Sequence, residues 1–334
     1  MTLLSICIPT YNRERMLAEA LKSILAQRSA DVEIVISDNA STDNTAAMVA
    51  KLQKQYPEIS YHRSAQNQGF DLNVLRVVEL AKGKYCWFLG DDDRIEPNGV
   101  AEVLAALAAY PDLGGICLGV KAYDKDMQKE TLSWNPTLGK YHNTTLFQNA
   151  DQCFSVLGHY LSFFSAQVIN RAAWMEIFQT GSWREFCEGF VHFYMIASVL
   201  KNQPCWLYLA PQCVGWRSGN DPLLAAVGFY ERLRFDIEGG EKVICAVLGK
   251  RSPAYHAIMR TGAAVHSSSI VLNARLNNID VRTRIQIAKL CFRYYGRYLP
   301  FWTNLIPILI MPTVGLRFVR YLARMYKKVF WPTG

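Results

Sequence analysis

Residues 3–43 read LLSICIPTYNRERMLAEALKSILAQRSADVEIVISDNASTD, and this stretch decides the fold. Its apolar runs at 3–8 and 32–37 have the length and composition of buried strands, and residues 14–27 repeat apolar positions at helical spacing. The alternation continues with a helix at 42–55, a strand at 59–62, a helix at 70–81 and a strand at 85–89. Repeated strand–helix units predict an α/β fold with a mostly parallel sheet, helices on both faces, and ligands outside the carboxyl ends of the strands.

The chain changes character twice after this alternation. From about residue 151 the segments are mixed and aromatic-rich, and from Pro222 onward they become helical, with long stretches at 223–248 and 255–276. We therefore expect a sheet domain over 1–221 and a helical C-terminal region over 222–334. With 334 residues and 51% hydrophobic content the chain can bury a sizeable core, so a disordered protein is not expected.

The cysteines and the first residues bear on where the protein works. Nine cysteines without a CxxC pair are expected to be reduced and packed. The first residues, MTLLSICIPTYNR, lack a basic lead, a long apolar stretch and a small-residue cleavage site, so no secretory signal is expected. These features favour a cytoplasmic protein.

The net charge of +8 is concentrated at one end of the chain. Residues 281–334 hold ten Lys or Arg and no Asp or Glu, whereas residues 1–280 carry 26 basic against 28 acidic side chains. A basic tail predicts contact with an anionic surface, either membrane or nucleic acid. Because these basic residues bracket the uncharged segment 298–316, we expect peripheral binding at the inner face of the cell membrane and no nucleic acid.

Segment 298–316 has no charged residue for nineteen positions, which approaches the length of a membrane span. It also contains Pro300, Pro307, Pro312 and Asn304, which disfavour a straight spanning helix. The alternatives are an interfacial or re-entrant anchor, a true span, and ordinary helical packing. The interleaved aromatic residues favour the interfacial anchor.

Gly90, Asp91, Asp92 and Asp93 directly follow the buried run 85–89. Three carboxylates at the end of a buried strand repel one another unless a cation lies between them. Mg²⁺ and Mn²⁺ prefer oxygen ligands and complete their shell with water and phosphate oxygens. We therefore predict a Mn²⁺ or Mg²⁺ site here, the alternative being a solvated acidic turn.

Two further turns follow predicted strands. ISDNASTD (36–43) places Asp38 where a carboxylate can accept from a base or ribose, with ordinary turn and capping chemistry as the alternative. PTYNRE (9–14), followed by Arg15, brings two guanidinium groups to a helix start. Together with the backbone amides there, a guanidinium could hold a diphosphate.

Four motifs in this order resemble the family 2 glycosyltransferases: PTYN (9–12), SDNASTD (37–43), NQG (67–69) with Asn73, and the acidic cluster at 91–93. The resemblance covers about residues 1–220. It implies a GT-A fold, in which a Rossmann-like sheet binds a nucleotide sugar and the acidic cluster carries the metal. The residues that it assigns to the nucleotide are Pro9, Thr10, Tyr11, Asn12, Asp38, Asn67, Gly69, Asp91 and Asp92.

The acidic cluster departs from the family pattern Asp-x-Asp-Asp, because Gly90 takes the first acidic place. From the resemblance we expect Asp93 to be the direct metal ligand. Asp91 is expected to contact ribose, or the metal through water, and Asp92 to turn toward the donor.

The Glu-Asp pair with which family members deprotonate the acceptor hydroxyl is also missing near residues 190–193. His192 is the first candidate for the base and Glu188 the second, with a structural histidine as the alternative. WRSGND (216–221) resembles the loop that closes over the donor. Arg217 is therefore expected to neutralise the departing diphosphate, with a surface turn as the alternative.

Residues 157–163 and 165–174 are similar to the corresponding region of bacterial O-antigen sugar transferases. They predict a wall of the sugar and acceptor pocket, with His159 at a sugar hydroxyl. Aromatic packing is the alternative explanation of the same pattern.

The resemblance implies transfer of one sugar from a nucleoside diphosphate donor to a glycan acceptor carried on a polyprenyl diphosphate lipid, with inversion if the usual course of the family applies. One alternative is a sugar-phosphate nucleotidylyltransferase, whose glycine-rich basic loop after the first strand is absent here. The other is a non-catalytic membrane-bound scaffold.

Overall fold

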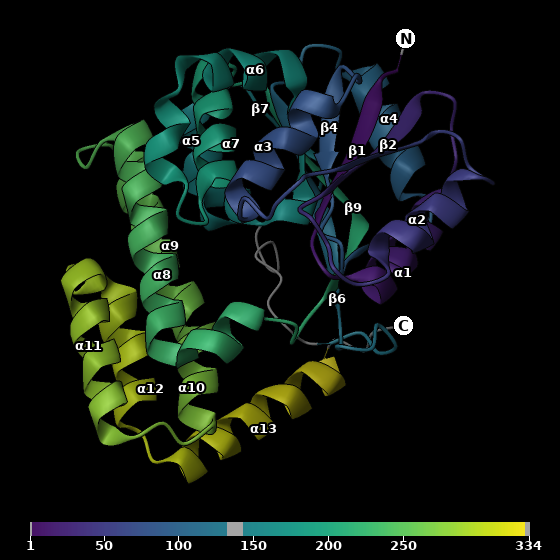
Figure 1. Ribbon diagram of the computed structural model, residues 1–334. Coiled ribbons are helices and arrows are strands. Elements are labelled where there is room, and N and C mark those ends of the chain that lie inside the picture. The colour runs from purple at the N-terminus through teal and green to yellow at the C-terminus, as the bar shows by residue number, and fades with distance from the viewer. Residues whose placement is uncertain (1, 132–142, 331–334) are drawn as a thin grey trace.

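The computed structural model describes residues 2–131 and 143–330 (Figure 1). Within these residues the sheet has nine strands in the order β3-β2-β1-β4-β8-β6-β9-β5, with β7 paired to β9. The strands are β1 (Leu4–Thr10), β2 (Val32–Asp38), β3 (Ile59–Arg63), β4 (Tyr85–Phe88), β5 (Arg94–Ile95), β6 (Gly115–Tyr123), β7 (Thr145–Phe147), β8 (Gln167–Asn170) and β9 (Trp206–Arg217).

Helices lie on both sides of this sheet (Figure 1). The α-helices between the strands are α1 (Glu14–Leu25), α2 (Thr45–Gln53), α3 (Phe70–Leu80), α4 (Gly99–Ala109), α5 (Ala150–Leu157), α6 (Arg171–Thr180) and α7 (Val191–Asn202). Three 3₁₀ turns complete this part, namely η1 (Gly158–Ser162), η2 (Phe164–Ala166) and η3 (Ser182–Phe186).

The central strand β1 lies between β2 and β4 and runs parallel to both. Its register pairs Thr10 with Asp38 and Cys7 with Phe88, so the turns after these three strands meet at one edge of the sheet. All seven residues of β1 are buried, because helices cover both faces. The predicted mostly parallel sheet is confirmed, and its second half adds antiparallel pairs where β8 runs against β4 and β6.

Local side-chain chemistry explains where the first helices lie and begin. On α1 the buried residues Leu17, Leu21 and Ile24 follow the helical spacing of three and four, which places them on one face against the sheet. The second helix was predicted from Thr42 but begins at Thr45. The reason is that Asp43 Oδ1 accepts hydrogen bonds from the Thr45 backbone N–H at 3.0 Å and from its hydroxyl at 2.5 Å, so residues 42–44 form the turn before the helix.

The C-terminal helices begin with α8 (Pro222–Leu248), whose first turn is capped by Asp221 accepting from the Leu224 N–H at 2.8 Å. The chain continues through α9 (Pro253–His266), the π-helical turn η4 (Ser267–Val271), α10 (Leu272–Leu276), α11 (Val281–Tyr295), the π-helical turn η5 (Phe301–Leu305), α12 (Ile306–Ile310) and α13 (Thr313–Phe330). The buried side chains of these helices, apart from α13, join the same apolar cluster as the sheet.

In segment 298–316 the π-helical turn η5 continues directly into α12, and α13 begins at Thr313 after a break at residues 311–312. Its apolar residues Phe301, Leu305 and Leu309 are buried, so ordinary helical packing accounts for that side of the segment. Among the residues that the structure describes, no helix combines the length and the apolar character needed to cross a bilayer.

A buried histidine pair joins the sheet domain to these helices. The rings of His159 in η1 and His266 in α9 lie 5.6 Å apart between centroids, and His266 Nδ1 is 2.7 Å from the Tyr295 hydroxyl of α11. Burial lowers the pKa of His159 to about 4 and that of His266 to about 3. Both rings are therefore neutral at neutral pH.

We predict that His266→Gln weakens the acid sensitivity of the fold. An unfolded histidine takes up a proton near pH 6.5, whereas folded His266 stays neutral down to about pH 3. Its contribution to stability is therefore fully present above about pH 6.5 and is lost, at about 1.4 kcal/mol per pH unit, as the pH falls through this window. The free energy of unfolding, measured with urea at several pH values between about 7 and 5, should therefore fall less steeply with decreasing pH in this variant. His62→Gln, at an exposed position of β3, is the control, and equal slopes in H266Q and the parent protein would contradict the prediction.

Candidate active site

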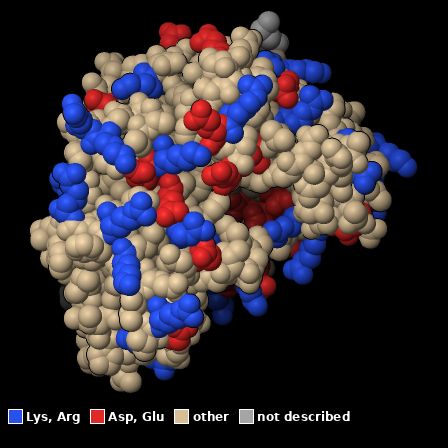
Figure 2. Space-filling view, turned by 60° about the vertical axis from the view of Figure 1, so that its left-hand side comes forward, with Lys and Arg blue, Asp and Glu red and all other residues tan. Residues whose placement is uncertain are grey.

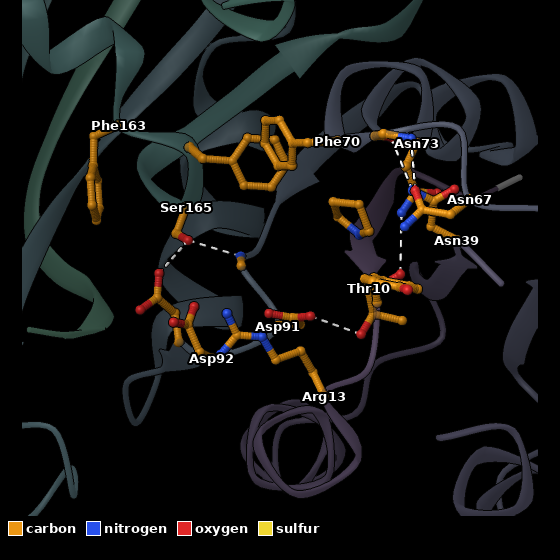
Figure 3. Close-up of a pocket in the computed structure, with 16 residues that line it drawn as sticks. Thr10, Arg13, Asn39, Asn67, Phe70, Asn73, Asp91, Asp92, Phe163 and Ser165 are labelled. Atoms are coloured by element: carbon orange, nitrogen blue, oxygen red, sulfur yellow. Dashed lines mark hydrogen bonds between the residues drawn. The ribbon is translucent and has the colours of Figure 1, made fainter. Parts of the chain in front are cut away.

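A pocket of about 510 Å³ opens at the edge of the sheet where β1 and β4 end. Most of its lining comes from residues 9–13 after β1, residues 67–73 around the start of α3, the acidic turn 90–93 after β4, and residues 163–165 around η2. Figure 2 shows a hollow in the molecular surface with acidic side chains on its floor, and Figure 3 shows the labelled side chains converging on one space. The motifs after the predicted strands therefore meet as expected.

The acidic turn is held from two sides. Asp91 Oδ2 accepts a hydrogen bond from the Thr10 hydroxyl at 2.8 Å, and Asp93 Oδ2 accepts one from the Ser165 hydroxyl at 2.5 Å (Figure 3). The Ser165 oxygen also accepts from the N–H of Gly90 at 2.9 Å. A Cβ at position 90 would lie 3.2 Å from the Ser165 hydroxyl and from an oxygen of Asp93. Glycine in the first place of the cluster therefore leaves room for this contact.

Burial and neighbouring charge make two of these carboxyl groups weaker acids than an ordinary aspartic acid. Burial first, and the charge of Asp92 second, raise the pKa of Asp91 to about 7 and that of Asp93 to about 8. A divalent cation beside them would restore the charged form, and three carboxylates are the hard oxygen donors that Mg²⁺ and Mn²⁺ prefer. Across the described residues no group of three or more His, Cys, Asp or Glu is arranged as a metal cage.

One guanidinium group lies beside the acidic turn. Arg13 lines the pocket, and its positive charge lowers the pKa of Asp91 against the larger effects that raise it. Within the described ranges Arg13 forms no ion pair, and its Nη1 lies 3.1 Å from the sulfur of Met16. Arg15, the second guanidinium predicted at this turn, is exposed and pairs with Glu19 at 3.2 Å. Arg13 is thus the cation available to an anionic ligand in the pocket.

Asparagine side chains fix the loops on the other side of the pocket. Asn39 donates to the side-chain oxygen of Asn67 at 2.8 Å and to the carbonyl of Gly69 at 3.1 Å. Asn73 donates to the carbonyl of Thr10 at 3.3 Å, which ties the start of α3 to the end of β1 (Figure 3). The predicted residues Thr10, Asn67 and Gly69 therefore line one pocket with Asn39. Asn39 was not singled out from the sequence, although it lies inside the 37–43 motif.

Residues of the turn after β1 have two roles, because some line the pocket and one supports the neighbouring loop. Pro9 and Tyr11 line the pocket, whereas Asn12 does not. Asn12 has a positive φ of 53°, and its side-chain oxygen accepts from the Thr42 N–H at 2.7 Å. This hydrogen bond joins the turn after β1 to the turn after β2.

Asp38 lies below the pocket surface and is fully buried. One carboxylate oxygen accepts from the Ser41 N–H at 2.8 Å and from its hydroxyl at 2.6 Å, and the other accepts from the Tyr61 hydroxyl at 2.5 Å. In this arrangement Asp38 shapes the 38–41 turn, and its contact with a nucleotide stays a prediction.

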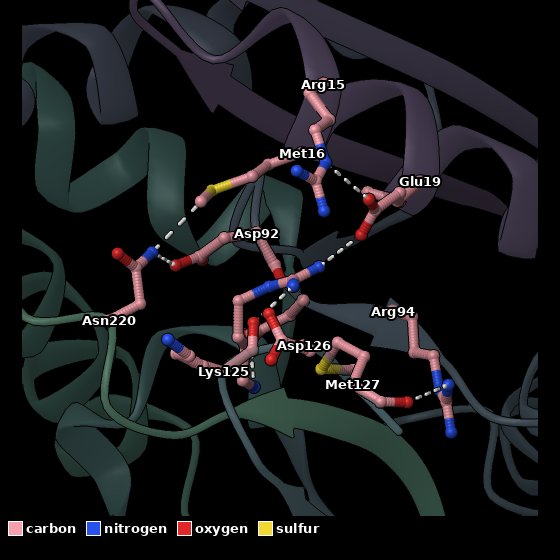
Figure 4. A network of polar contacts seen from close by, with 12 residues as sticks. Arg15, Met16, Glu19, Asp92, Arg94, Lys125, Asp126, Met127 and Asn220 are labelled. Carbon is pink, nitrogen blue, oxygen red and sulfur yellow. Dashed lines mark hydrogen bonds and ion pairs between the residues drawn. The ribbon is translucent and has the colours of Figure 1, made fainter.

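Arg217 connects the acidic turn to the rest of the protein and does not line the pocket. Its backbone N–H donates to Asp93 Oδ1 at 3.0 Å, and its guanidinium donates to the carbonyls of Asp92 at 2.8 Å and Lys125 at 2.7 Å. The same guanidinium pairs with Glu19 of α1 at 2.6 Å (Figure 4). The Arg217 side chain is buried, whereas the predicted surface turn follows it at residues 218–219, where Gly219 has a φ of 82°.

An aromatic wall formed by Phe70, Phe163 and Phe164 lines another part of the pocket (Figure 3). His192 lies in the layer behind it, with its ring 5.8 Å from that of Phe70 and 5.7 Å from that of Phe164 between centroids. Its Nε2 is 3.0 Å from the Ser162 carbonyl, while Nδ1 has no hydrogen-bond partner among the described residues. Burial lowers the pKa of His192 to about 4, so the ring is neutral at neutral pH.

Two other predicted residues lie outside the pocket lining. Glu188 is exposed and lies 3.6 Å from Lys242 of α8. His159 packs against α9, where it contacts His266, while residues 163–165 of the predicted wall do line the pocket.

Comparison with known proteins gives one family. The model of the family described as Glycosyl transferase family 2 matches residues 5–171. The chain is 32% identical over 228 residues to the abequosyltransferase RfbV of Salmonella typhimurium strain LT2, covering 66% of this chain and 68% of that protein. It is 35% identical over 117 residues to the GalNAc(5)-diNAcBac-PP-undecaprenol beta-1,3-glucosyltransferase of Campylobacter jejuni, covering 34% of this chain and 38% of that protein.

Solved structures show the same fold. The fragment 1–349 of S. aureus TarS is similar with a TM-score of 0.64 at 15% identity, covering 97% of this chain and 92% of that one. Its complex with UDP-GlcNAc has a TM-score of 0.61 at 14% identity over the same shares. The predicted GT-A fold is therefore confirmed.

We predict that Arg217→Lys lowers the free energy of unfolding by about 2 to 4 kcal/mol, because a lysine cannot reach two carbonyls and Glu19 at once from a buried position. Urea unfolding measures the change. Arg15→Lys is the matched control, since Arg15 pairs with the same Glu19 from an exposed position and should change stability by less than about 0.5 kcal/mol. Similar small changes in both variants would contradict the anchoring role of Arg217.

Proposed function

The chain belongs to glycosyl transferase family 2 and is a glycosyltransferase, and from this we propose that it moves a single sugar from a nucleoside diphosphate sugar to a glycan acceptor. The observation that carries the proposal is that the acidic turn 91–93 and the guanidinium of Arg13 line one pocket. Among the described residues that guanidinium forms no ion pair. Such a pair of charges suits a diphosphate, because the guanidinium binds its oxygens and the carboxylates recruit a cation to it. Membership of this family argues against the two alternatives, a sugar-phosphate nucleotidylyltransferase and a non-catalytic scaffold.

The donor nucleoside lies, in this proposal, against Pro9, Thr10 and Tyr11 on one side and Asn67 and Gly69 on the other. These residues line the same pocket and are fixed to one another by the asparagine hydrogen bonds described above. Asn12 and Asp38 contribute by holding the two turns in place, since their side chains bond to residues 41 and 42. The donor then extends past Arg13 toward the acidic turn.

Asp93 and Asp91 are the residues that would hold Mn²⁺ or Mg²⁺, with Asp92 turned toward the donor. The Thr10 and Ser165 hydroxyls each occupy one lone pair of these carboxylates, which fixes their oxygens and leaves other lone pairs for a ligand. When bound, such an ion would neutralise the charge that develops on the leaving nucleoside diphosphate. Asn220 donates to Asp92 and holds it from the side of β9.

Two arginines near the acidic turn have different roles in this proposal. Arg13 faces the pocket and is the guanidinium that contacts the diphosphate. Arg217 was expected from the sequence in that role, but its guanidinium is engaged by Glu19 and two carbonyls. We therefore propose that Arg217 acts as a positioning residue, through the acidic turn that it anchors.

His192 remains the first candidate for the base that deprotonates the acceptor hydroxyl. Its ring is neutral, and its Nδ1 lone pair is not used by any described residue. Phe70 lines the pocket in contact with this ring and is half exposed, so its side chain has room to turn aside and admit a hydroxyl. Glu188 is the second candidate, because it is exposed and its charge is shared with Lys242. Attack by the activated hydroxyl opposite the leaving diphosphate would invert the sugar.

The acceptor in this proposal is a glycan on a polyprenyl diphosphate lipid, such as an O-antigen or other cell-surface polysaccharide precursor. The names of the two curated relatives support this class, since one is an abequosyltransferase and the other acts on a PP-undecaprenol glycan. An acceptor of that kind is membrane-borne. We therefore propose that the protein works in the cytoplasm, peripherally at the inner face of the cell membrane, through its basic C-terminal region.

Asp93→Asn and Asp91→Asn are each predicted to lower sugar transfer by about 100-fold or more, because each removes a charged ligand for the ion. Thermal denaturation with UDP-, GDP-, CDP- and dTDP-sugars and Mn²⁺ should show stabilisation by one nucleotide class in the parent protein, and both variants should lose its metal-dependent part. The exposed Asp112→Asn serves as control. Absence of stabilisation by every nucleotide, with and without metal, would overturn the donor site.

His192→Gln is predicted to lower kcat by about 100-fold while the KM for the donor changes less than about twofold, because the base acts on the acceptor hydroxyl and not on the nucleotide. Steady-state kinetics with saturating acceptor separate the two parameters. Glu188→Gln is the comparison, and its kcat should stay close to that of the parent. A large loss of kcat in E188Q with none in H192Q would exchange the two assignments.

A further inference from the structure

The outer face of α13 carries an apolar stripe. Val314, Phe318, Tyr321 and Leu322 are spaced by four, three and one positions, which places them on one side of a helix. Their exposed fractions are 78%, 58%, 57% and 48%, which are high values for large apolar side chains. The stripe is therefore a continuous apolar surface and not a set of scattered residues.

The first turn of the same helix is packed. Leu316 is only 4% exposed and α13 packs chiefly against α10, whereas residues 317–322 are all exposed. The turn that leads into α13 is fixed as well, because Arg275 of α10 donates to the carbonyls of Ile308 at 3.1 Å and Met311 at 2.6 Å. The helix is thus tethered at its N-terminal end, and its stripe faces outward.

The charged residues in the sequence of α13 are all basic. Arg317 lies next to the stripe, Arg320 lies three positions further along the helix, and residues 281–334 contain no Asp or Glu. Two copies of this chain that met through their stripes would bring these arginines together and repel, whereas anionic headgroups would neutralise them. Among possible occupants, the charge therefore favours an anionic bilayer over a second copy.

We propose that α13 lies in the plane of an anionic membrane surface, with Val314, Phe318, Tyr321 and Leu322 inserted and Arg317 and Arg320 at the headgroups. The inference rests on the proposed function, because that function requires a membrane-borne acceptor. It assigns membrane contact to α13, whereas the sequence favoured segment 298–316. In Figure 1, α13 runs below the edge of the sheet where β1 and β4 end, which is the edge that holds the pocket. Docking through α13 thus brings the pocket side of the molecule toward the bilayer.

The test is co-sedimentation of the full chain with vesicles of phosphatidylcholine alone and of equal parts phosphatidylcholine and phosphatidylglycerol. The parent protein should bind the anionic vesicles, less so at high salt, and should not bind the neutral ones. Phe318→Glu should lower the bound fraction by about tenfold or more, as should the double variant Arg317→Glu with Arg320→Glu. Val227→Glu, which places the same charge at an exposed apolar position of α8, is the matched control and should bind like the parent.

Parent protein that fails to bind anionic vesicles, or F318E that binds them as well as the parent, would overturn the proposal. A concentration-dependent dimer in the parent that F318E abolishes would also overturn it, by assigning the stripe to a second copy. Circular dichroism and thermal denaturation establish that each variant is folded. Donor turnover by the parent protein, measured separately without vesicles, tests the sugar-transfer proposal. If the parent binds anionic vesicles but turns over no donor, the sugar-transfer proposal alone is overturned. If it turns over a donor but does not bind vesicles, only the membrane role of α13 is overturned.

Discussion

Three adjacent carboxylates at the end of a buried strand are the feature on which the rest of the site depends. All four residues of β4 are buried, so the turn that follows emerges from the apolar core with little solvent around it. Burial raises the pKa of Asp91 and Asp93, which measures the cost of keeping them charged without a cation. The hydroxyls of Thr10 and Ser165 and the backbone N–H of Arg217 offset part of that cost. In the proposed function, a divalent cation beside the turn would offset the rest of that cost.

The contacts that hold this turn come from distant parts of the chain. Thr10 ends β1, Ser165 lies in η2 and Arg217 ends β9, so the turn reaches its geometry only when both halves of the sheet are packed together. The parallel half contains the family motifs but only one of these three contacts. Glu19 extends the same network back to α1 through Arg217. The second half of the sheet, where parallel and antiparallel pairs are mixed, therefore contributes to the site by positioning the acidic residues as much as by supplying the pocket wall.

The parallel half could be predicted from the sequence because its signals are local. Strands β1, β2 and β4 are short, mainly apolar runs that are followed by polar motifs, and the helices predicted at 14–27 and 70–81 differ from α1 and α3 only at their ends. Ser165 could not be found in this way, since its contact with the acidic turn depends on where β8 pairs with β4. The surroundings of His192 were equally hidden. The rings of Phe70 and Phe164 meet it only through tertiary packing.

In the C-terminal region, the apolar composition of a segment does not predict which of its residues are exposed. Segment 298–316 is uncharged, yet Phe301 and Leu305 are buried because η5 packs against η4 and α9. The following helix, α13, is richer in charge, yet it leaves its apolar stripe outside because Leu316, in its first turn, is the one buried residue among its described side chains. Sequence windows record composition and cannot tell which apolar surface another helix covers. In the membrane proposal, an anionic bilayer covers the apolar stripe of α13 and its neighbouring basic side chains, which the described helices leave exposed.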